Sequence, residues 1–100
     1  MDKKTIQKIV AEVMQEAPDA KNIKSISLFG SFLHGDNNDK SDIDLLFEMN
    51  KTMSLFEIGG IHYQLEQKFG RRVDFVPKNS VIRQLRDKII PEAEKIYERK

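Results

Sequence analysis

The sequence contains no cysteine and no long apolar run, and these two absences narrow the kinds of protein that it can encode. Without cysteine there is no disulfide framework, no thiolate nucleophile and no cysteine-based zinc site. No apolar run approaches the roughly 20 residues needed to cross a bilayer. The first residues are charged, unlike the apolar core of a signal peptide. We therefore expect a cytoplasmic protein without a membrane partner.

The chain also lacks a strong excess of charge of either sign, with 17 Lys or Arg against 16 Asp or Glu and a net charge of +1. This balance argues against direct binding of long nucleic acids, which requires a basic surface. A content of 39% hydrophobic and 33% charged residues is typical of a folded globular protein. We expect one domain over residues 1–100. Such a small domain buries a modest fraction of its surface, so a homo- or hetero-oligomeric partner could add stability.

Hydrophobic periodicity predicts alternating helices and strands. We expect helices over 3–16, 54–69 and 81–89, and strands near 26–29, 42–48 and 73–76. A Ser-x-x-Glu capping box at Ser54 begins the second helix and Gly70 ends it. Gly59 and Gly60 inside that helix each cost about 1 kcal/mol relative to alanine, which close approach of another group to the helix backbone would explain.

After the helix expected over 81–89, Pro91 restarts a short final segment. Taken together, the elements predict a small mixed sheet of at least three strands flanked by helices, an α/β (α+β) domain.

The residues able to carry chemistry gather in the stretch LFGSFLHGDNNDKSDIDLLFE. Gly30 and Ser31 follow a predicted strand, where glycine lets the backbone approach a ligand. The N–H groups that follow, and the Ser31 hydroxyl, can donate to phosphate oxygens. Ten residues later, Asp42 and Asp44 begin the next strand, and strand alternation directs both carboxylates to one face. Asp74 offers a third carboxylate from a separate strand.

Three clustered carboxylates suit the binding of divalent cations. Hard ions such as Mg²⁺ take oxygen ligands and share a few carboxylates with substrate phosphates and water. Two ions about 4 Å apart can hold the attacking and leaving oxygens of a phosphoryl transfer. We therefore predict two Mg²⁺ ions at Asp42, Asp44 and Asp74, and a nucleoside triphosphate at Gly30 and Ser31. The alternative interpretation is an ordinary turn followed by an ordinary loop boundary.

The pattern of Gly-Ser, a ten-residue gap, Asp-x-Asp and a later aspartate resembles the polymerase-beta-like nucleotidyltransferases, and within them the minimal nucleotidyltransferases of prokaryotes. The similarity spans residues 25–98 and includes the segments SDIDLLFE, KFGRRVDFV and IIPEAEKIYE. This resemblance implies the polymerase-beta-like fold. It also implies that Asp42 and Asp44 bind both metal ions, that Asp74 is the third ligand and the base that activates the acceptor, and that Gly30 and Ser31 grip the triphosphate of ATP.

Two features near these motifs leave alternatives open. Many family members carry arginine where this chain has His34, and a neutral histidine is a weaker phosphate partner than arginine. An ordinary surface role is the alternative for His34. Arg71 and Arg72 precede the strand that carries Asp74, so one of them could reach a phosphate, and two solvated arginines are the alternative interpretation.

Small members of this family often accompany a helical HEPN-type ribonuclease toxin and act as its antitoxin. The resemblance therefore implies transfer of AMP from ATP to a tyrosine of such a toxin, with release of pyrophosphate. One alternative is a non-catalytic antitoxin that neutralises its partner by direct contact. Another is nucleotidylation of a small molecule such as an aminoglycoside, for which a chain of 100 residues offers little room to build a deep acceptor pocket.

Overall fold

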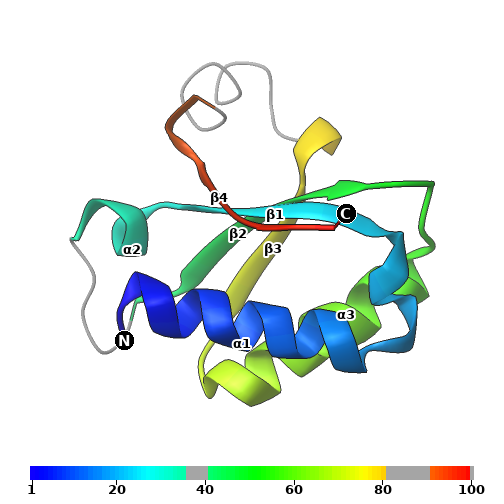
Figure 1. The fold of residues 1–100 in the computed structure, drawn as a ribbon, viewed down its shortest axis with the longest axis horizontal. Helices are drawn as coiled ribbons and strands as arrows, with labels where there is room; N and C mark the ends of the chain where they lie inside the picture. The colour runs from blue at the N-terminus through cyan, green and yellow to red at the C-terminus, as the bar shows by residue number, and fades with distance from the viewer. Residues whose placement is uncertain (36–40, 81–90, 100) are drawn as a thin grey trace.

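Two long helices cover one face of a four-stranded sheet in the computed structural model, which describes residues 1–35, 41–80 and 91–99 (Figure 1). The helices are α1 (Lys3–Glu16), α2 (Ser31–His34) and α3 (Leu55–Phe69), with 3-10 helices η1 (Pro18–Asn22) and η2 (Lys78–Ser80). The strands are β1 (Ile23–Phe29), β2 (Ile43–Met49), β3 (Val73–Pro77) and β4 (Glu94–Glu98). None of the helices in the described ranges has the length and apolar character needed to span a bilayer.

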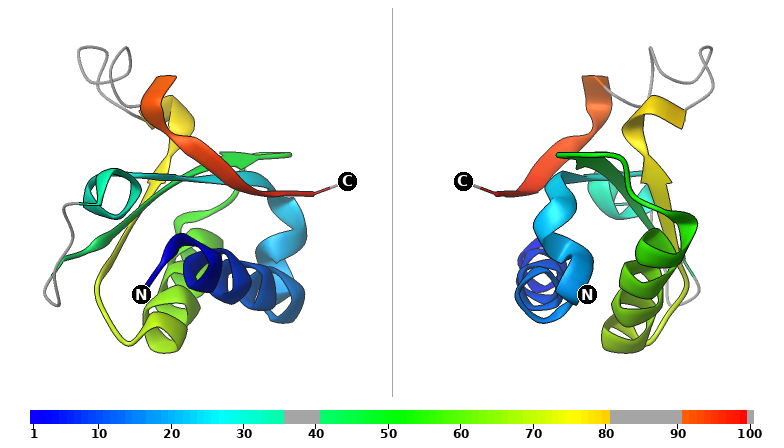
Figure 2. Two further views of the ribbon diagram at one scale, coloured as in Figure 1. Left: turned by 60° about the vertical axis from the view of Figure 1, so that its left-hand side comes forward. Right: turned by 90° about the vertical axis from the view of Figure 1, so that its right-hand side faces the viewer.

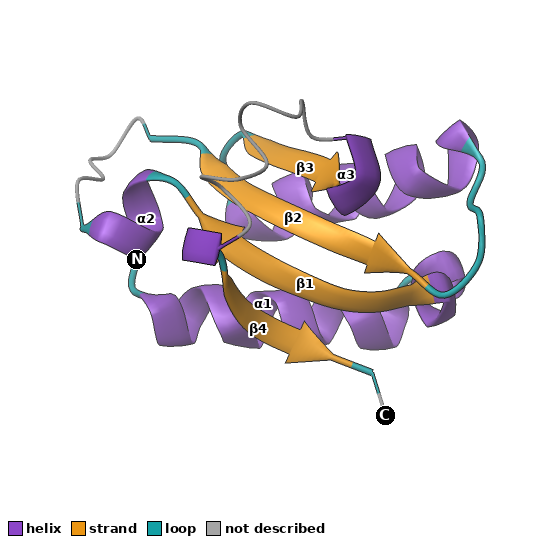
Figure 3. Cartoon of the chain, turned by 90° about the horizontal axis from the view of Figure 1, so that it is seen from above, coloured by secondary structure: helices purple, strands orange, loops and turns teal. Residues whose placement is uncertain are grey.

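The sheet is mixed, with the strands in the order β3-β2-β1-β4. β1 is antiparallel to both β2 and β4, whereas β2 and β3 are parallel and are connected through α3. Figure 3 looks onto the sheet from the face opposite the two long helices, with α2 at the end of β1. Because β1 and β2 are antiparallel, α2 lies at the same end of the sheet as the start of β2. The start of β3 lies there too, since it runs alongside β2.

Helix α3 begins and ends as the sequence predicted. The Ser54 hydroxyl accepts a hydrogen bond from the Glu57 N–H, and the Glu57 carboxylate accepts one from the Ser54 N–H. Gly70 ends the helix in the left-handed conformation, with φ of 67°. A Cβ added to Gly59 or Gly60 would meet no described atom within 4 Å. The close approach that was expected to explain these two glycines is therefore not found within the described residues.

The two views of Figure 2 show the two long helices on one side of the sheet. Buried apolar side chains form one core between these helices and the sheet. Alternation along β2 buries Ile43, Leu45 and Phe47 on the helix side, so Asp44 faces the other side of the sheet. In β3, Val73 and Phe75 are buried in the same layer. The remaining core side chains on α1, α3, β1 and β4 are Ile6, Val10, Val13, Met14, Ile23, Ile26, Leu28, Ile61, Leu65, Phe69 and Ile96.

The C-terminal part contains a strand that the sequence did not predict. Residues 94–98 of the short final segment form β4, which pairs with β1 at the edge of the sheet. Ile96 is buried while Glu94 and Lys95 are exposed, because the strand turns one side chain toward the α1 side of the sheet. The helix predicted over 81–89 lies outside the described residues.

Candidate active site

The two halves of the predicted motif meet at the end of the sheet where α2 lies (Figure 3). Phe29, the last residue of β1, pairs with Asp44 of β2, so the turn at Gly30 lies beside that aspartate. Gly30 has φ of 75°, and a Cβ in its place would collide with the Asp44 carboxylate. Glycine is therefore required here for two reasons, the left-handed backbone and the close approach of a carboxylate.

Asp44 and Asp74 are direct neighbours across the parallel strands β2 and β3. Their side chains are hydrogen-bonded to each other. Burial, the hydrogen bond with Asp74 and the negative charges of Asp74 and Asp42 together raise the pKa of Asp44 to about 7, with burial the largest cause. A protonated Asp44 donates to the Asp74 carboxylate. The pair thus retains a proton at a point where two like charges would otherwise face each other.

Asp42 lies two residues before Asp44, just ahead of the first residue of β2. Its Oδ2 is 3.8 Å from Nε of Arg72, and its side chain is 38% exposed. Within the described residues, no three acidic, histidine or cysteine side chains form a ready-made cation site. The structure thus brings Asp44 and Asp74 together and leaves Asp42 beside them, facing an arginine.

This donor set fits a hard divalent cation. Mg²⁺ in proteins is commonly held by one or two carboxylates, together with phosphate oxygens and water. The Asp44–Asp74 pair supplies that number of carboxylates, and a cation between them would replace the shared proton. Asp42, on the same stretch of chain, is the next oxygen donor available.

The phosphate-binding residues of the prediction are only partly visible. Helix α2 starts directly after Gly30, and the Leu33 N–H donates to the Gly30 carbonyl at 3.1 Å. The side chains of Ser31 and His34 lie outside the described part of the structure, so their predicted roles stay predictions. The other histidine of the chain, His62, makes a structural contact: its Nε2 lies 2.6 Å from the Val73 carbonyl oxygen.

Arg71 connects the two halves of the motif, which sequence analysis did not anticipate. Its Nη1 donates to the Ser41 carbonyl at 3.2 Å, just before β2. Its guanidinium lies over the Phe32 ring of α2, 5.2 Å from the ring centroid. The Ile43 N–H donates to the Arg72 carbonyl at 3.1 Å, which joins the starts of β2 and β3. No local sequence signal marks this connection, because it depends on residues 32, 41 and 71 meeting in the fold.

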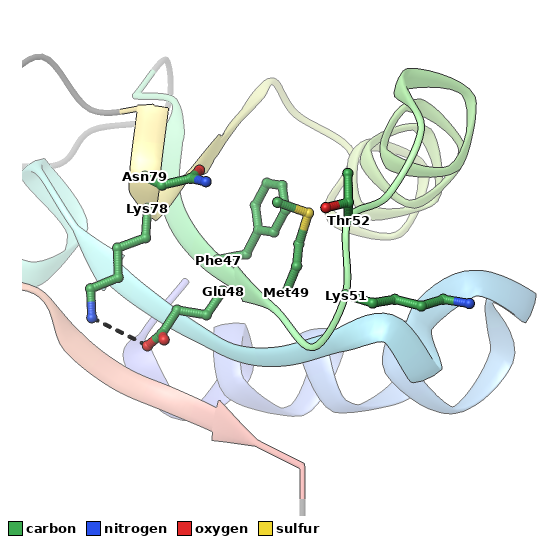
Figure 4. A pocket seen from close by; sticks show the side chains of 7 residues that line it. All are labelled: Phe47, Glu48, Met49, Lys51, Thr52, Lys78 and Asn79. Atoms are coloured by element: carbon green, nitrogen blue, oxygen red, sulfur yellow. Dashed lines mark hydrogen bonds and ion pairs between the residues drawn. The ribbon is translucent and has the colours of Figure 1, made fainter.

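A cleft among the described residues lies toward the other end of β2 (Figure 4). This cleft of about 560 Å³ is lined by Phe47, Glu48, Met49, Lys51, Thr52, Lys78 and Asn79. On one side of it, Lys78 Nζ donates to Glu48 Oε1 at 3.2 Å. A smaller cleft of about 170 Å³ shares Glu48 and Lys78. Neither cleft includes the three aspartates, which lie toward the α2 end of the sheet.

Comparison with known proteins gives this geometry a family. Residues 7–100 match the family model described as polymerase beta, nucleotidyltransferase. The chain belongs to this family. Among its relatives, a candidate protein adenylyltransferase of Methanocaldococcus jannaschii is 37% identical over 71 residues, which cover 71% of this chain and 76% of the relative. Protein adenylyltransferase MntA of Thermococcus cleftensis is 30% identical over 76 residues, covering 76% of this chain and 77% of the relative.

Solved structures share the fold of this nucleotidyltransferase. A candidate minimal nucleotidyltransferase superposes with a TM-score of 0.76 at 27% identity, covering 93% of this chain and 94% of the other. A chain of a toxin–antitoxin structure with AMP-PNP gives 0.76 at 19% identity, with coverage of 94% and 74%. A chain from the complex of a tri-AMPylated Shewanella oneidensis HEPN toxin with an MNT antitoxin gives 0.71 at 16% identity, with coverage of 96% and 72%. The predicted fold class and family are confirmed.

Proposed function

We propose that this nucleotidyltransferase transfers AMP from Mg²⁺-bound ATP to a protein, specifically to a tyrosine of a HEPN-type toxin, and thereby acts as a cytoplasmic antitoxin. Residues 1–100 act as a single domain in this proposal. The observation that carries it is the pair of hydrogen-bonded carboxylates, Asp44 and Asp74, packed against the Gly30 turn. The names of the adenylyltransferase relatives and the toxin–antitoxin structures with the same fold support the choice of acceptor.

Each predicted site residue has a distinct role in this proposal. Asp42 and Asp44 hold two Mg²⁺ ions, and Asp74 is a ligand of one of them. When bound, the ions supply positive charge that offsets the charge of the triphosphate as the phosphoryl group transfers. Gly30 leaves room for the Asp44 carboxylate to lie against the turn that grips the triphosphate, and the Ser31 hydroxyl donates to a phosphate oxygen.

The reaction needs one base and one leaving group. The phenol oxygen of the acceptor attacks the α-phosphorus of ATP and forms a new phosphorus–oxygen bond. The bond between the α-phosphorus and the oxygen bridging to the β-phosphorus breaks, and pyrophosphate leaves with the electron pair. Asp74 accepts the phenolic proton, a role open to a carboxylate that is ionised when a cation replaces the proton it shares with Asp44.

The test measures AMP transfer to a purified HEPN-type toxin encoded beside this chain. The toxin is incubated with ATP, Mg²⁺ and the wild-type protein, and intact mass spectrometry counts the AMP groups added. The double variant Asp42→Ala/Asp44→Ala should add none, whereas Asp19→Ala, which removes a carboxylate in η1, should act like the wild type. Unchanged transfer by the double variant would overturn the assignment of the site. Full neutralisation of the toxin by that variant without transfer would favour the alternative of a non-catalytic antitoxin.

A further inference from the structure

Two adjacent arginines at the start of β3 are held in different ways. Arg71 is engaged by the Ser41 carbonyl and the Phe32 ring. The Arg72 side chain is 75% exposed, and it forms an ion pair with Asp42 in which Nε lies 3.8 Å from Oδ2. The first arginine therefore fastens α2 to the start of β2, while the second reaches the carboxylate cluster from solvent.

The Arg72–Asp42 pair is poorly suited to be a purely structural contact. Both side chains are substantially exposed, and the separation is near the limit for an ion pair. Exposed pairs of this kind contribute little to stability, because water screens the charges and the long side chain loses freedom. A guanidinium binds phosphate oxygens with two parallel hydrogen bonds, which is a stronger and more specific arrangement.

The balance of charge at the site also calls for a cation from the protein. Asp42, Asp44 and Asp74 together bring three negative charges when ionised, and a nucleoside triphosphate brings about four more, so two divalent ions leave the assembly negative. Within the described part of the chain, Arg72 forms an ion pair with one of these carboxylates, that of Asp42. Its guanidinium is therefore placed to supply positive charge at the site.

From these observations we propose that Arg72 binds the β- or γ-phosphate of the nucleoside triphosphate and leaves Asp42 when that carboxylate takes a cation. Arg71 remains in place as a positioning residue, because its contacts hold α2 and β2 together. This inference rests on the proposed function, since it requires a triphosphate at the carboxylate cluster. It assigns to this chain a contact for the part of the nucleotide that leaves as pyrophosphate.

The experiment measures equilibrium binding by titration calorimetry in Mg²⁺, with AMP-PNP and AMP as the two probes. Arg72→Ala should weaken AMP-PNP binding about ten-fold or more, the usual effect of removing a hydrogen bond to a charged group. Binding of AMP, which lacks the β- and γ-phosphates, should change less than two-fold. Arg72→Lys should retain part of the AMP-PNP affinity. Lys8→Ala, an exposed charge on α1, is the matched control and should bind both probes like the wild type.

A second measurement separates a phosphate contact from an effect on the cation site. Binding of Mn²⁺ without nucleotide should be unchanged or tighter in Arg72→Ala, because the Arg72 guanidinium no longer competes with the metal ion for the Asp42 carboxylate. Equal AMP-PNP affinity in wild type and Arg72→Ala would overturn the role of Arg72 and leave the proposed function intact, as would a parallel loss of Mn²⁺ binding. Failure of the wild type to bind AMP-PNP in Mg²⁺ would overturn the proposed function and this inference together.

Discussion

Gly30 shows how much one residue determines at this site. The sequence predicted a turn there and a ligand near its backbone, and the structure adds that the Asp44 carboxylate occupies the space of the missing side chain. Strand alternation was enough to predict that the Asp44 side chain lies on the opposite face of the sheet from its neighbours Ile43 and Leu45. The contact between Asp44 and Asp74 was expected only as clustering, because it depends on the register of two parallel strands that are 30 residues apart.

Replacing Gly30 by alanine should reduce AMP transfer by at least ten-fold, since the Cβ would displace the Asp44 carboxylate. Gly35→Ala is the matched control. Gly35 has a nearly identical φ of 78°, but a Cβ there meets no atom of the described residues within 4 Å. Both variants should lose about 1 kcal/mol or more of stability from left-handed alanine. Initial rates at saturating ATP, with thermal unfolding in parallel, separate the two effects, and equal rates for the two variants would argue against the role of Gly30.

The raised pKa of Asp44 predicts a dependence of stability on pH in the metal-free protein. The folded state holds a proton up to a pKa of about 7, whereas the unfolded carboxyl releases it near 4. The free energy of unfolding should therefore fall as the pH rises from about 4 to 7, by on the order of 1–2 kcal/mol after solvent screening is allowed for. Asp44→Asn should lack this loss. Urea unfolding in EDTA from about pH 4 to 8 measures the difference.

Addition of Mg²⁺ at pH 8 provides the control for that experiment. The ion should stabilise the wild type, because it neutralises the ionised pair, and should have little effect on Asp44→Asn. A wild type and Asp44→Asn variant with the same pH profile would show that Asp44 does not titrate in the folded state as described.

At the scale of elements, the strongest local signals predicted best. The apolar periodicity of α1, and the capping box and terminal glycine of α3, identified both helices with their ends. Strand β4 was not predicted, because its five residues are mostly charged and become a strand only by pairing with β1. Its alternation around Ile96 was the one available signal.

The two glycines in α3 give a prediction about stability. Gly59→Ala and Gly60→Ala should each raise the free energy of unfolding by about 0.5–1 kcal/mol, because each position is helical and an added Cβ meets no atom of the described chain within 4 Å. Gly70→Ala should instead lower it by about 1 kcal/mol, because Gly70 has φ of 67°. Chemical denaturation of the three variants tests this contrast. Loss of stability in both α3 variants would indicate that something approaches this helix surface.

At the scale of the whole molecule, a catalyst and a stoichiometric inhibitor differ in turnover. The proposed enzyme should silence a many-fold molar excess of toxin when ATP and Mg²⁺ are present. It should fail to do so when either is omitted. The ribonuclease activity of the toxin, measured at a series of molar ratios of the two proteins, shows how many toxin molecules each molecule of this protein silences. Silencing that requires equal amounts of the two proteins and no ATP would support neutralisation by contact.

The central claim is that Asp44 and Asp74, joined by Asp42, hold divalent cations beside the Gly30 turn. The most direct measurement is a crystal structure of this chain with Mn²⁺ and AMP-PNP, in which anomalous scattering locates the metal. We predict Mn²⁺ directly bound to carboxylate oxygens of both Asp44 and Asp74, with the triphosphate against Gly30. Mn²⁺ and nucleotide bound elsewhere, for example in the cleft beside Lys78, with Asp44 and Asp74 still sharing a proton, would contradict it.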